Sequence, residues 1–159
     1  MNLKELNNWL RQLPAQVMED VGDIVAETAT EHFKESFTRK AFNGNPWAPA
    51  QNPRKNGSLL IDSGALVNSI HPSYVGPDKV IISAGNEKVS YAKAHNEGVN
   101  ETVAVPAHQR KSKKGKVHQV KAHSKNLNLP KREFMGDSAE LNKAIHGRVE
   151  KYVQLKLKK

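Results

Sequence analysis

Residues 17–38 read VMEDVGDIVAETATEHFKESFT, and this stretch predicts the longest helix of the chain. Side chains suited to a buried helix face recur in it mostly at intervals of three or four residues. They are Val17, Val21, Ile24, Val25, Thr28, Phe33 and Phe37. Acidic residues fill the other faces, and those in the first turns suit the positive end of the helix dipole. An amphipathic helix of this kind buries its apolar face against other elements of the fold.

Helical patterns are also present near both ends of the chain. An apolar stripe precedes Pro14 and consists of Leu3, Leu6, Trp9, Leu10 and Leu13. Pro14 either ends this helix or occupies the first turn of the next one. Residues 138–157 predict a closing helix that Asp137 or Ser138 can cap. Its apolar face consists of Leu141, Ile145, Val149, Tyr152 and Val153.

Short segments with β-strand character lie between the long helices. Residues 71–75 and 79–84 flank a Gly-Pro-Asp turn and predict a hairpin. Residues 101–108 and 117–123 predict two strands joined by the basic loop 109–116. The expected fold is therefore α+β. It has a small, mainly antiparallel sheet packed by the long N-terminal helix and the C-terminal helix, and a basic β-hairpin protrudes from it.

The length of 159 residues is that of a single domain. Within it we expect a helical N-terminal part at 1–40, a basic hairpin at 102–132 and a C-terminal helix at 137–158. The segment 43–57 is rich in asparagine, proline and glycine and predicts a loop. Trp47 lies within this loop, and we expect its large apolar ring to be buried as an anchor.

The positive charge of the chain is concentrated in one segment. The net charge is +9, and residues 102–132 contain nine of the 25 basic residues and no acidic residue. The other 16 basic residues balance the 16 acidic ones. A neutral body with one basic hairpin indicates a directed contact with an acidic partner. The contact residues we expect are Arg110, Lys111, Lys113, Lys114, Lys116, Lys121 and Lys125.

Three interpretations of this hairpin stay open at the level of sequence. It is a solvated charged loop, it contacts an acidic protein surface, or it neutralises phosphates along a DNA backbone. Residues 109–125 contain no aromatic side chain, so the segment does not indicate stacking on bases.

The residue pattern argues against an enzyme and against a cofactor or metal site. The chain has no cysteine, and the spacing of His95, His108, His118 and His123 matches no metal-binding motif. No nucleophile elbow or phosphate-binding glycine loop is present, and the spacing of the acidic residues singles out no pair for acid–base catalysis. A hydrolase would need such groups to be brought together by the fold. We expect His95 to form a local hydrogen bond while its ring packs.

No stretch reaches the roughly 18 apolar residues of a membrane span. The N-terminus lacks the apolar run of a secretory signal, since Lys4 and Glu5 lie where that run would be. We therefore expect no membrane association, and synthesis in the cytoplasm of the cell that makes the protein.

Four short motifs follow one another along the chain. They read FNGNPW at 42–47, LLIDSGALVNSI at 59–70, YAKAHNEG at 91–98 and PKREFMG at 130–136. We expect Ser63 to cap a short helix, Gly98 to end a helical turn, and Phe134 to dock the last helix onto the sheet. The residues expected to maintain the fold are Trp47, Ser63, Gly64, Leu66, Tyr91, His95, Gly98, Arg132, Phe134 and Gly136.

In this order, and over residues 17–153, these motifs resemble those of the virion-morphogenesis, or tail-completion, proteins of tailed phages and Mu-like prophages. The resemblance implies a structural protein at the virion neck, which completes or caps the tail or joins it to the head. It also implies a homo-oligomeric ring, with a hexamer as the first expectation. The implied partners are the end of the tail tube, the head–tail connector proteins and the DNA that passes through the lumen. The implied locations are the host bacterial cytoplasm during assembly and the virion afterwards.

The segment 103–124 is longer and more basic than the family pattern. Its role is therefore not covered by the resemblance. The alternative function is a DNA-binding accessory protein that uses the basic hairpin on the phosphate backbone.

Overall fold

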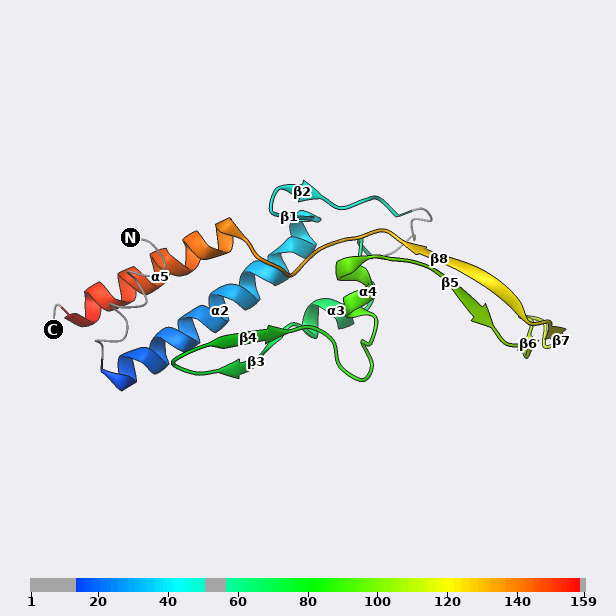
Figure 1. Ribbon diagram of the computed structural model, residues 1–159, viewed down its shortest axis with the longest axis horizontal. Helices are drawn as coiled ribbons and strands as arrows, with labels where there is room; N and C mark the ends of the chain where they lie inside the picture. The colour runs from blue at the N-terminus through cyan, green and yellow to red at the C-terminus, as the bar shows by residue number, and fades with distance from the viewer. Residues whose placement is uncertain (1–13, 51–56, 158–159) are drawn as a thin grey trace.

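The two longest helices lie side by side and form the body of the protein (Figure 1). The computed structural model describes residues 14–50 and 57–157. Helix α2 spans Ala15–Arg39 and helix α5 spans Ala139–Leu157. The hairpin of β3 (His71–Val75) and β4 (Val80–Ser83) packs against α2 as well. The predicted α+β class, both long helices and this hairpin are confirmed. The apolar stripe predicted before Pro14 lies outside the described residues.

The contact between α2 and α5 has a buried apolar centre. Val21 of α2 packs with Val149 and Val153 of α5, and all three side chains are buried. Ser138 caps α5, since the N–H of Leu141 donates a hydrogen bond of 3.2 Å to the Ser138 hydroxyl. Because both helices bury one face in this contact, neither needs high intrinsic helix propensity to be stable.

An aromatic cluster forms the core beside the C-terminal end of α2. The Phe37 ring lies 5.3 Å from the Trp47 ring, edge to face, and 5.1 Å from the Phe134 ring, measured between centroids. The Trp47 indole N–H donates a hydrogen bond of 2.6 Å to the carbonyl of Glu133. Trp47 is therefore buried, as predicted. Phe134 was predicted to dock the last helix onto a sheet, but its ring packs against the side of α2.

The antiparallel pairing is divided among separate ladders instead of forming one sheet. Within the described ranges the ladders are β1–β2 (Ala41–Phe42 and Asn45–Pro46), β3–β4, β5–β8 and β6–β7. Strands β5 (Val99–Val105) and β8 (His123–Leu129) form the longest of them, followed outward by β6 (His108–Lys111) and β7 (Val117–Val120). Each hairpin pairs with itself, so no strand bridges one ladder to the next.

The predicted basic loop is shorter in the structure. Residues 109–111 belong to β6, and the turn occupies 112–116. The turn is closed by the N–H of Ser112, which donates to the carbonyl of Lys116 at 2.8 Å. The predicted strand 101–108 is divided into β5 and β6 at Pro106, because proline has no N–H to give to a ladder.

The predicted cap at Ser63 is wrong. Helix α3 spans Ala65–Asn68, and Gly64 occupies the capping position with a φ of 77°. The Ser63 hydroxyl lies 3.4 Å from the N–H of Ala65, one residue too early in the helix for a cap. Only glycine adopts this left-handed backbone conformation at low cost, so the turn depends on Gly64.

Candidate interaction surfaces

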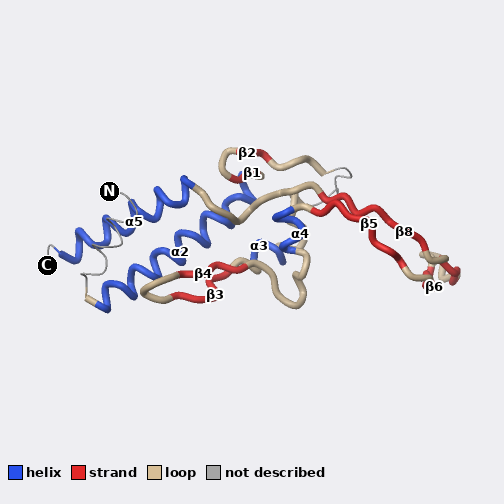
Figure 2. The backbone as a smooth tube through the Cα atoms, in the orientation of Figure 1, coloured by secondary structure: helices blue, strands red, loops and turns tan. Residues whose placement is uncertain are grey.

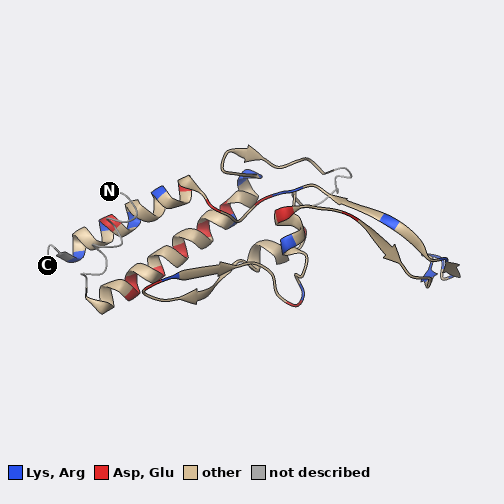
Figure 3. Cartoon of the chain, in the orientation of Figure 1, with Lys and Arg blue, Asp and Glu red and all other residues tan. Residues whose placement is uncertain are grey.

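A long β-structure projects from the body and carries most of the excess positive charge (Figures 1, 2 and 3). We call residues 99–129 the basic arm. All predicted contact residues lie on it and all are exposed; they are Arg110, Lys111, Lys113, Lys114, Lys116, Lys121 and Lys125. The first five are gathered at the tip, on β6 and the turn that follows it. The predicted protrusion is thus present, and its contacts remain predictions.

The two faces of the β5–β8 ladder differ in polarity. The register places Val103 beside Lys125 and Leu127 beside Glu101 on one face. Val103 is 41% exposed and Leu127 is 38% exposed. The opposite face is polar, and the Thr102 hydroxyl donates a 2.9 Å hydrogen bond across it to the Asn126 side chain. A two-stranded ladder with both faces exposed is marginally stable by itself.

The histidines of the basic arm do not form a metal site. Strands β6 and β7 place His108 opposite Val120 and His118 opposite Arg110. Over residues 14–50 and 57–157, no group of histidine and acidic side chains is arranged to hold a metal ion.

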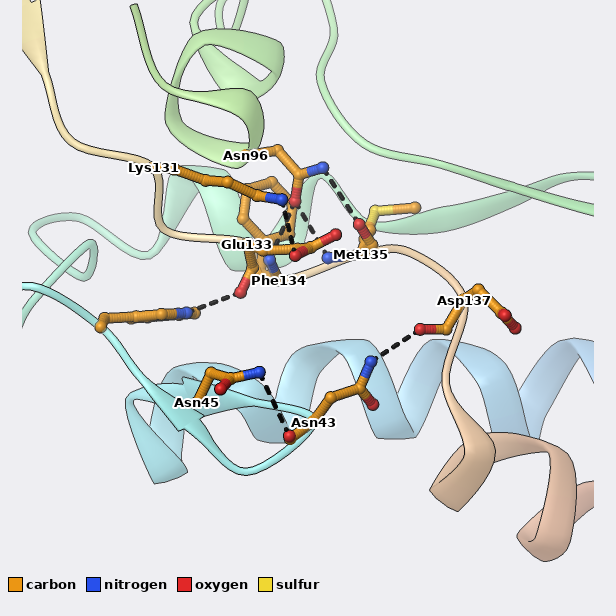
Figure 4. A network of polar contacts seen from close by, with 9 residues as sticks. Asn43, Asn45, Asn96, Lys131, Glu133, Phe134, Met135 and Asp137 are labelled. Carbon is orange, nitrogen blue, oxygen red and sulfur yellow. Dashed lines mark hydrogen bonds and ion pairs between the residues drawn. The ribbon is translucent and has the colours of Figure 1, made fainter.

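The root of the basic arm is tied to the segment that leads into α5 (Figure 4). Asn96 lies near the end of α4 (Ala92–Glu97), just before β5. Its side-chain oxygen accepts hydrogen bonds from the N–H groups of Phe134 at 2.9 Å and Met135 at 3.0 Å. Its NH₂ group donates to the carbonyl of Met135 at 3.0 Å. Asn96 was not among the predicted residues; its place inside the motif 91–98 was the only signal in the sequence.

Gly98 makes the same junction possible by its lack of a side chain. It ends α4 with a φ of 78°. A Cβ atom at this position would lie 2.9 Å from the backbone nitrogen of Lys131 and 3.1 Å from the carbonyl oxygen of Leu129. The predicted end of the helical turn at Gly98 is confirmed, and the glycine also permits close approach of the two chain segments.

Six predicted motif residues from separate parts of the sequence line one cavity of about 930 Å³. They are Trp47, Ser63, Leu66, Tyr91, His95 and Arg132. The remaining ones lie outside the lining: Gly64 and Gly98 shape turns, Phe134 is in the aromatic core, and Gly136 lies against Phe42. Residues of all four motifs, which are far apart along the chain, therefore meet at one place in the fold.

Arg132 connects this cavity to the loop that follows Trp47. Its side chain is buried, with 6% of the residue exposed. The guanidinium donates hydrogen bonds to the carbonyls of Ala48 at 2.8 Å and Pro49 at 3.1 Å. Its own N–H donates to the carbonyl of His95 at 2.9 Å. Arg132 thus joins the motif at 91–98 to the loop that follows the motif at 42–47, and its bonds to the backbone give it a structural role.

His95 does not form the local side-chain hydrogen bond that was predicted. Its ring packs edge to face on Tyr91, with centroids 5.7 Å apart. The buried Nδ1 atom has no hydrogen-bond partner among the described residues. The backbone groups of His95 are already paired. Its carbonyl accepts a hydrogen bond from the N–H of Arg132, and its N–H donates one to the carbonyl of Tyr91. Burial lowers the pKa of His95 below the usual histidine value, and the nearby charge of Arg132 lowers it further.

This lowered pKa predicts a loss of stability in acid. The unfolded chain binds a proton at His95 near pH 6.5, whereas the folded chain binds it only at lower pH. Stability should therefore fall as the pH drops through 6.5 toward the folded-state pKa. We expect the His95→Gln variant to have a flatter profile of unfolding free energy between pH 7.5 and about pH 5 than the native chain. The same substitution at exposed His71 is the control, and equal slopes for both variants would contradict the assignment.

Comparison with known proteins identifies one family. A model of the phage virion morphogenesis family matches residues 1–154. Comparisons with curated proteins and with solved structures gave no match. The described helices include none with the length and apolar character that crossing a membrane requires.

Proposed function

The chain belongs to the phage virion morphogenesis family, and from this premise we propose that it completes the virion neck as one subunit of a ring. Family membership implies a role in virion assembly. The finer role that we propose is to cap or complete the tail, or to join it to the head, through contacts with the end of the tail tube and the connector proteins. This role is structural and involves no catalysis.

The observation that carries the proposal is the shape and exposure of the basic arm. In an isolated subunit the ladder projects into solvent and leaves the apolar side chains of Val103 and Leu127 exposed, which does not stabilise the fold. A ring repeats each projection around an axis, and contacts of head-to-tail type close when the rotation between copies permits it. In such a ring the tips of the arms would be presented either to the lumen, where DNA passes, or to an acidic neighbour.

Mass in solution tests the ring. We expect light scattering across protein and salt concentrations to show one discrete oligomer, with a hexamer at six times the chain mass of 17.7 kDa. A chain that stays monomeric at the highest concentration, and that also fails to add to purified tail ends as more than one copy per tail, would contradict the proposal.

DNA contact is a second candidate function for the same tip. Five basic side chains between Arg110 and Lys116 favour it, since each neutralised phosphate releases counterions. A titration with duplex DNA at several salt concentrations would show binding that weakens steeply with salt. The variant with alanine at Arg110, Lys111, Lys113, Lys114 and Lys116 should lose that binding. Replacement of five exposed lysines outside the basic arm, namely Lys79, Lys88, Lys93, Lys143 and Lys151, is the control for total charge.

A further inference from the structure

Helix α2 is rich in acidic residues, and the basic arm projects away from it (Figure 3). Six of its residues are acidic, namely Glu19, Asp20, Asp23, Glu27, Glu31 and Glu35, against two basic residues, Lys34 and Arg39. The basic arm contains seven basic residues and one acidic residue, Glu101. The chain thus separates its charges into an acidic helix and a basic projection. Since the basic arm extends away from α2, its tip cannot reach the acidic residues of α2 in the same copy (Figure 1).

A groove of about 550 Å³ runs between α2 and strand β3. Asp23, Glu27 and Glu31 line it, together with Ala26, Thr30, Lys34, Pro72 and Val75. We call these residues the acidic groove. Glu31 already forms an ion pair of 2.7 Å with Arg148 of α5. Asp23 and Glu27 are exposed, and neither has an ion-pair partner within the described part of the chain, so both are available to a partner.

The acidic groove also has apolar surface at its edge. Val75 is 39% exposed, and on the same hairpin Tyr74 is 47% exposed and Ile81 is 43% exposed. A matching ligand would therefore be basic with some apolar surface. The basic arm has this composition, since Val117, 58% exposed, lies beside Lys111 in the ladder.

The spacing of charges is compatible as well. Asp23, Glu27 and Glu31 are four residues apart, which corresponds to about 6 Å along a helix for each step. The tip carries Arg110, Lys111, Lys113, Lys114 and Lys116 within seven residues, and successive residues of an extended chain lie about 3.4 Å apart. Two of these cations can therefore lie near Asp23 and Glu27 at the same time.

We propose that the basic arm of one copy docks in the acidic groove of a neighbouring copy. The inference rests on the proposed ring, and it specifies the contact that would build it. The two surfaces lie on different parts of the subunit, so the contact is heterologous, and it produces a closed ring when the rotation between copies closes. Opposite charges bring the two surfaces together and specify their orientation, while the exposed apolar residues supply area to bury.

Site-directed crosslinking tests this contact. The chain has no cysteine, so each introduced cysteine is the only thiol of its variant. One variant carries Gln109→Cys in the basic arm and the other carries Val75→Cys at the edge of the acidic groove. The two are mixed and treated with a short bifunctional maleimide. We expect the mixed pair to crosslink at least about tenfold faster than a control pair of Gln109→Cys with Lys151→Cys on α5, because docking raises the effective concentration. Equal rates for the two pairs would overturn the proposal.

Charge reversal tests whether these charges drive the docking. In the crosslinking background, Lys113→Glu with Lys114→Glu in the basic arm should reduce the rate about tenfold or more, as should Asp23→Lys with Glu27→Lys in the acidic groove. Mixing the reversed arm with the reversed groove should restore it. Reversal of Glu87 and Glu150, which lie outside the groove, is the matched control. Unchanged rates after either reversal, or failure of the restored pairing while each variant keeps its native circular dichroism spectrum, would refute the docking.

The outcomes separate this inference from the proposed function. If a discrete oligomer persists in the charge-reversed variants, the proposed ring is retained and the basic arm is not the contact that builds it. Selective crosslinking of Gln109→Cys to Val75→Cys, with open chains of varying mass in light scattering, supports the docking and removes the closed ring. Duplex DNA that binds the basic arm without slowing the crosslink would show that docking does not use the DNA-binding charges, and this too would overturn the proposal.

Discussion

The Phe134→Ala variant should lose about 3–5 kcal/mol of unfolding free energy, the range typical of a buried phenylalanine truncated to alanine. Phe134 is 1% exposed and contacts Phe37, which in turn packs on Trp47. Its removal leaves a cavity that this cluster cannot readily fill, because the Trp47 indole is held by the carbonyl of Glu133. Chemical denaturation followed by circular dichroism measures the effect.

Two controls show whether the loss comes from the cavity. Phe134→Leu keeps most of the buried volume and should cost clearly less than the alanine variant. Tyr74→Ala removes a ring of similar size that is 47% exposed, and the free energy of unfolding should change little. A loss below about 1 kcal/mol for Phe134→Ala would mean that the segment 130–136 is not part of the cooperative core.

The Asn96→Ala variant should lose about 2–6 kcal/mol, because it leaves the N–H groups of Phe134 and Met135 without their acceptor. Each unpaired buried donor costs about 1–3 kcal/mol. The same substitution loosens the root of the basic arm, because it removes the three side-chain hydrogen bonds that tie Asn96 to Phe134 and Met135. We therefore expect faster hydrogen exchange at the amides of Phe134 and Met135, and weaker self-association as a secondary effect.

Asn96→Asp and Glu97→Ala separate the possible causes. The aspartate keeps an oxygen for both N–H groups and loses only the donor to the carbonyl of Met135, so its loss should be intermediate. Glu97 is exposed and pairs only loosely with Lys93 at 3.9 Å, so its truncation should be nearly neutral. If Asn96→Ala were as stable as Glu97→Ala, the bonds at the arm root would contribute nothing to folding.

The helices and hairpins could be predicted because their signals are local. The apolar periodicity of residues 17–38 and 138–157 depends only on the geometry of a helix, and α2 and α5 follow it closely. The turn between β3 and β4 and the end of α4 at Gly98 are likewise encoded by neighbouring residues. The positive charge of the basic arm is a property of composition, and it does not depend on the fold.

Errors arose where one residue had more than one plausible local role. Serine is a common helix cap, yet the left-handed backbone at Gly64 moves Ser63 out of the capping position. A half-buried histidine commonly forms a local bond, yet the ring of His95 packs on Tyr91 and its Nδ1 atom is left unpaired. Pro106 divides the predicted strand 101–108 because proline has no N–H to donate to a ladder. The register in which pairing resumes after Pro106 also depends on the opposite strand.

The sequence by itself determined the two long helices, the β3–β4 hairpin, the family motifs and the separation of charge between helix and hairpin, because each depends on residues close together in the chain. Only the tertiary structure decided that six motif residues line one cavity, that Asn96 joins the arm root to the segment before α5, and that an acidic groove lies between α2 and β3. These features need backbone segments far apart in the sequence to approach within hydrogen-bonding or packing distance. That approach depends on how the amphipathic faces bury one another, and no local pattern specifies it.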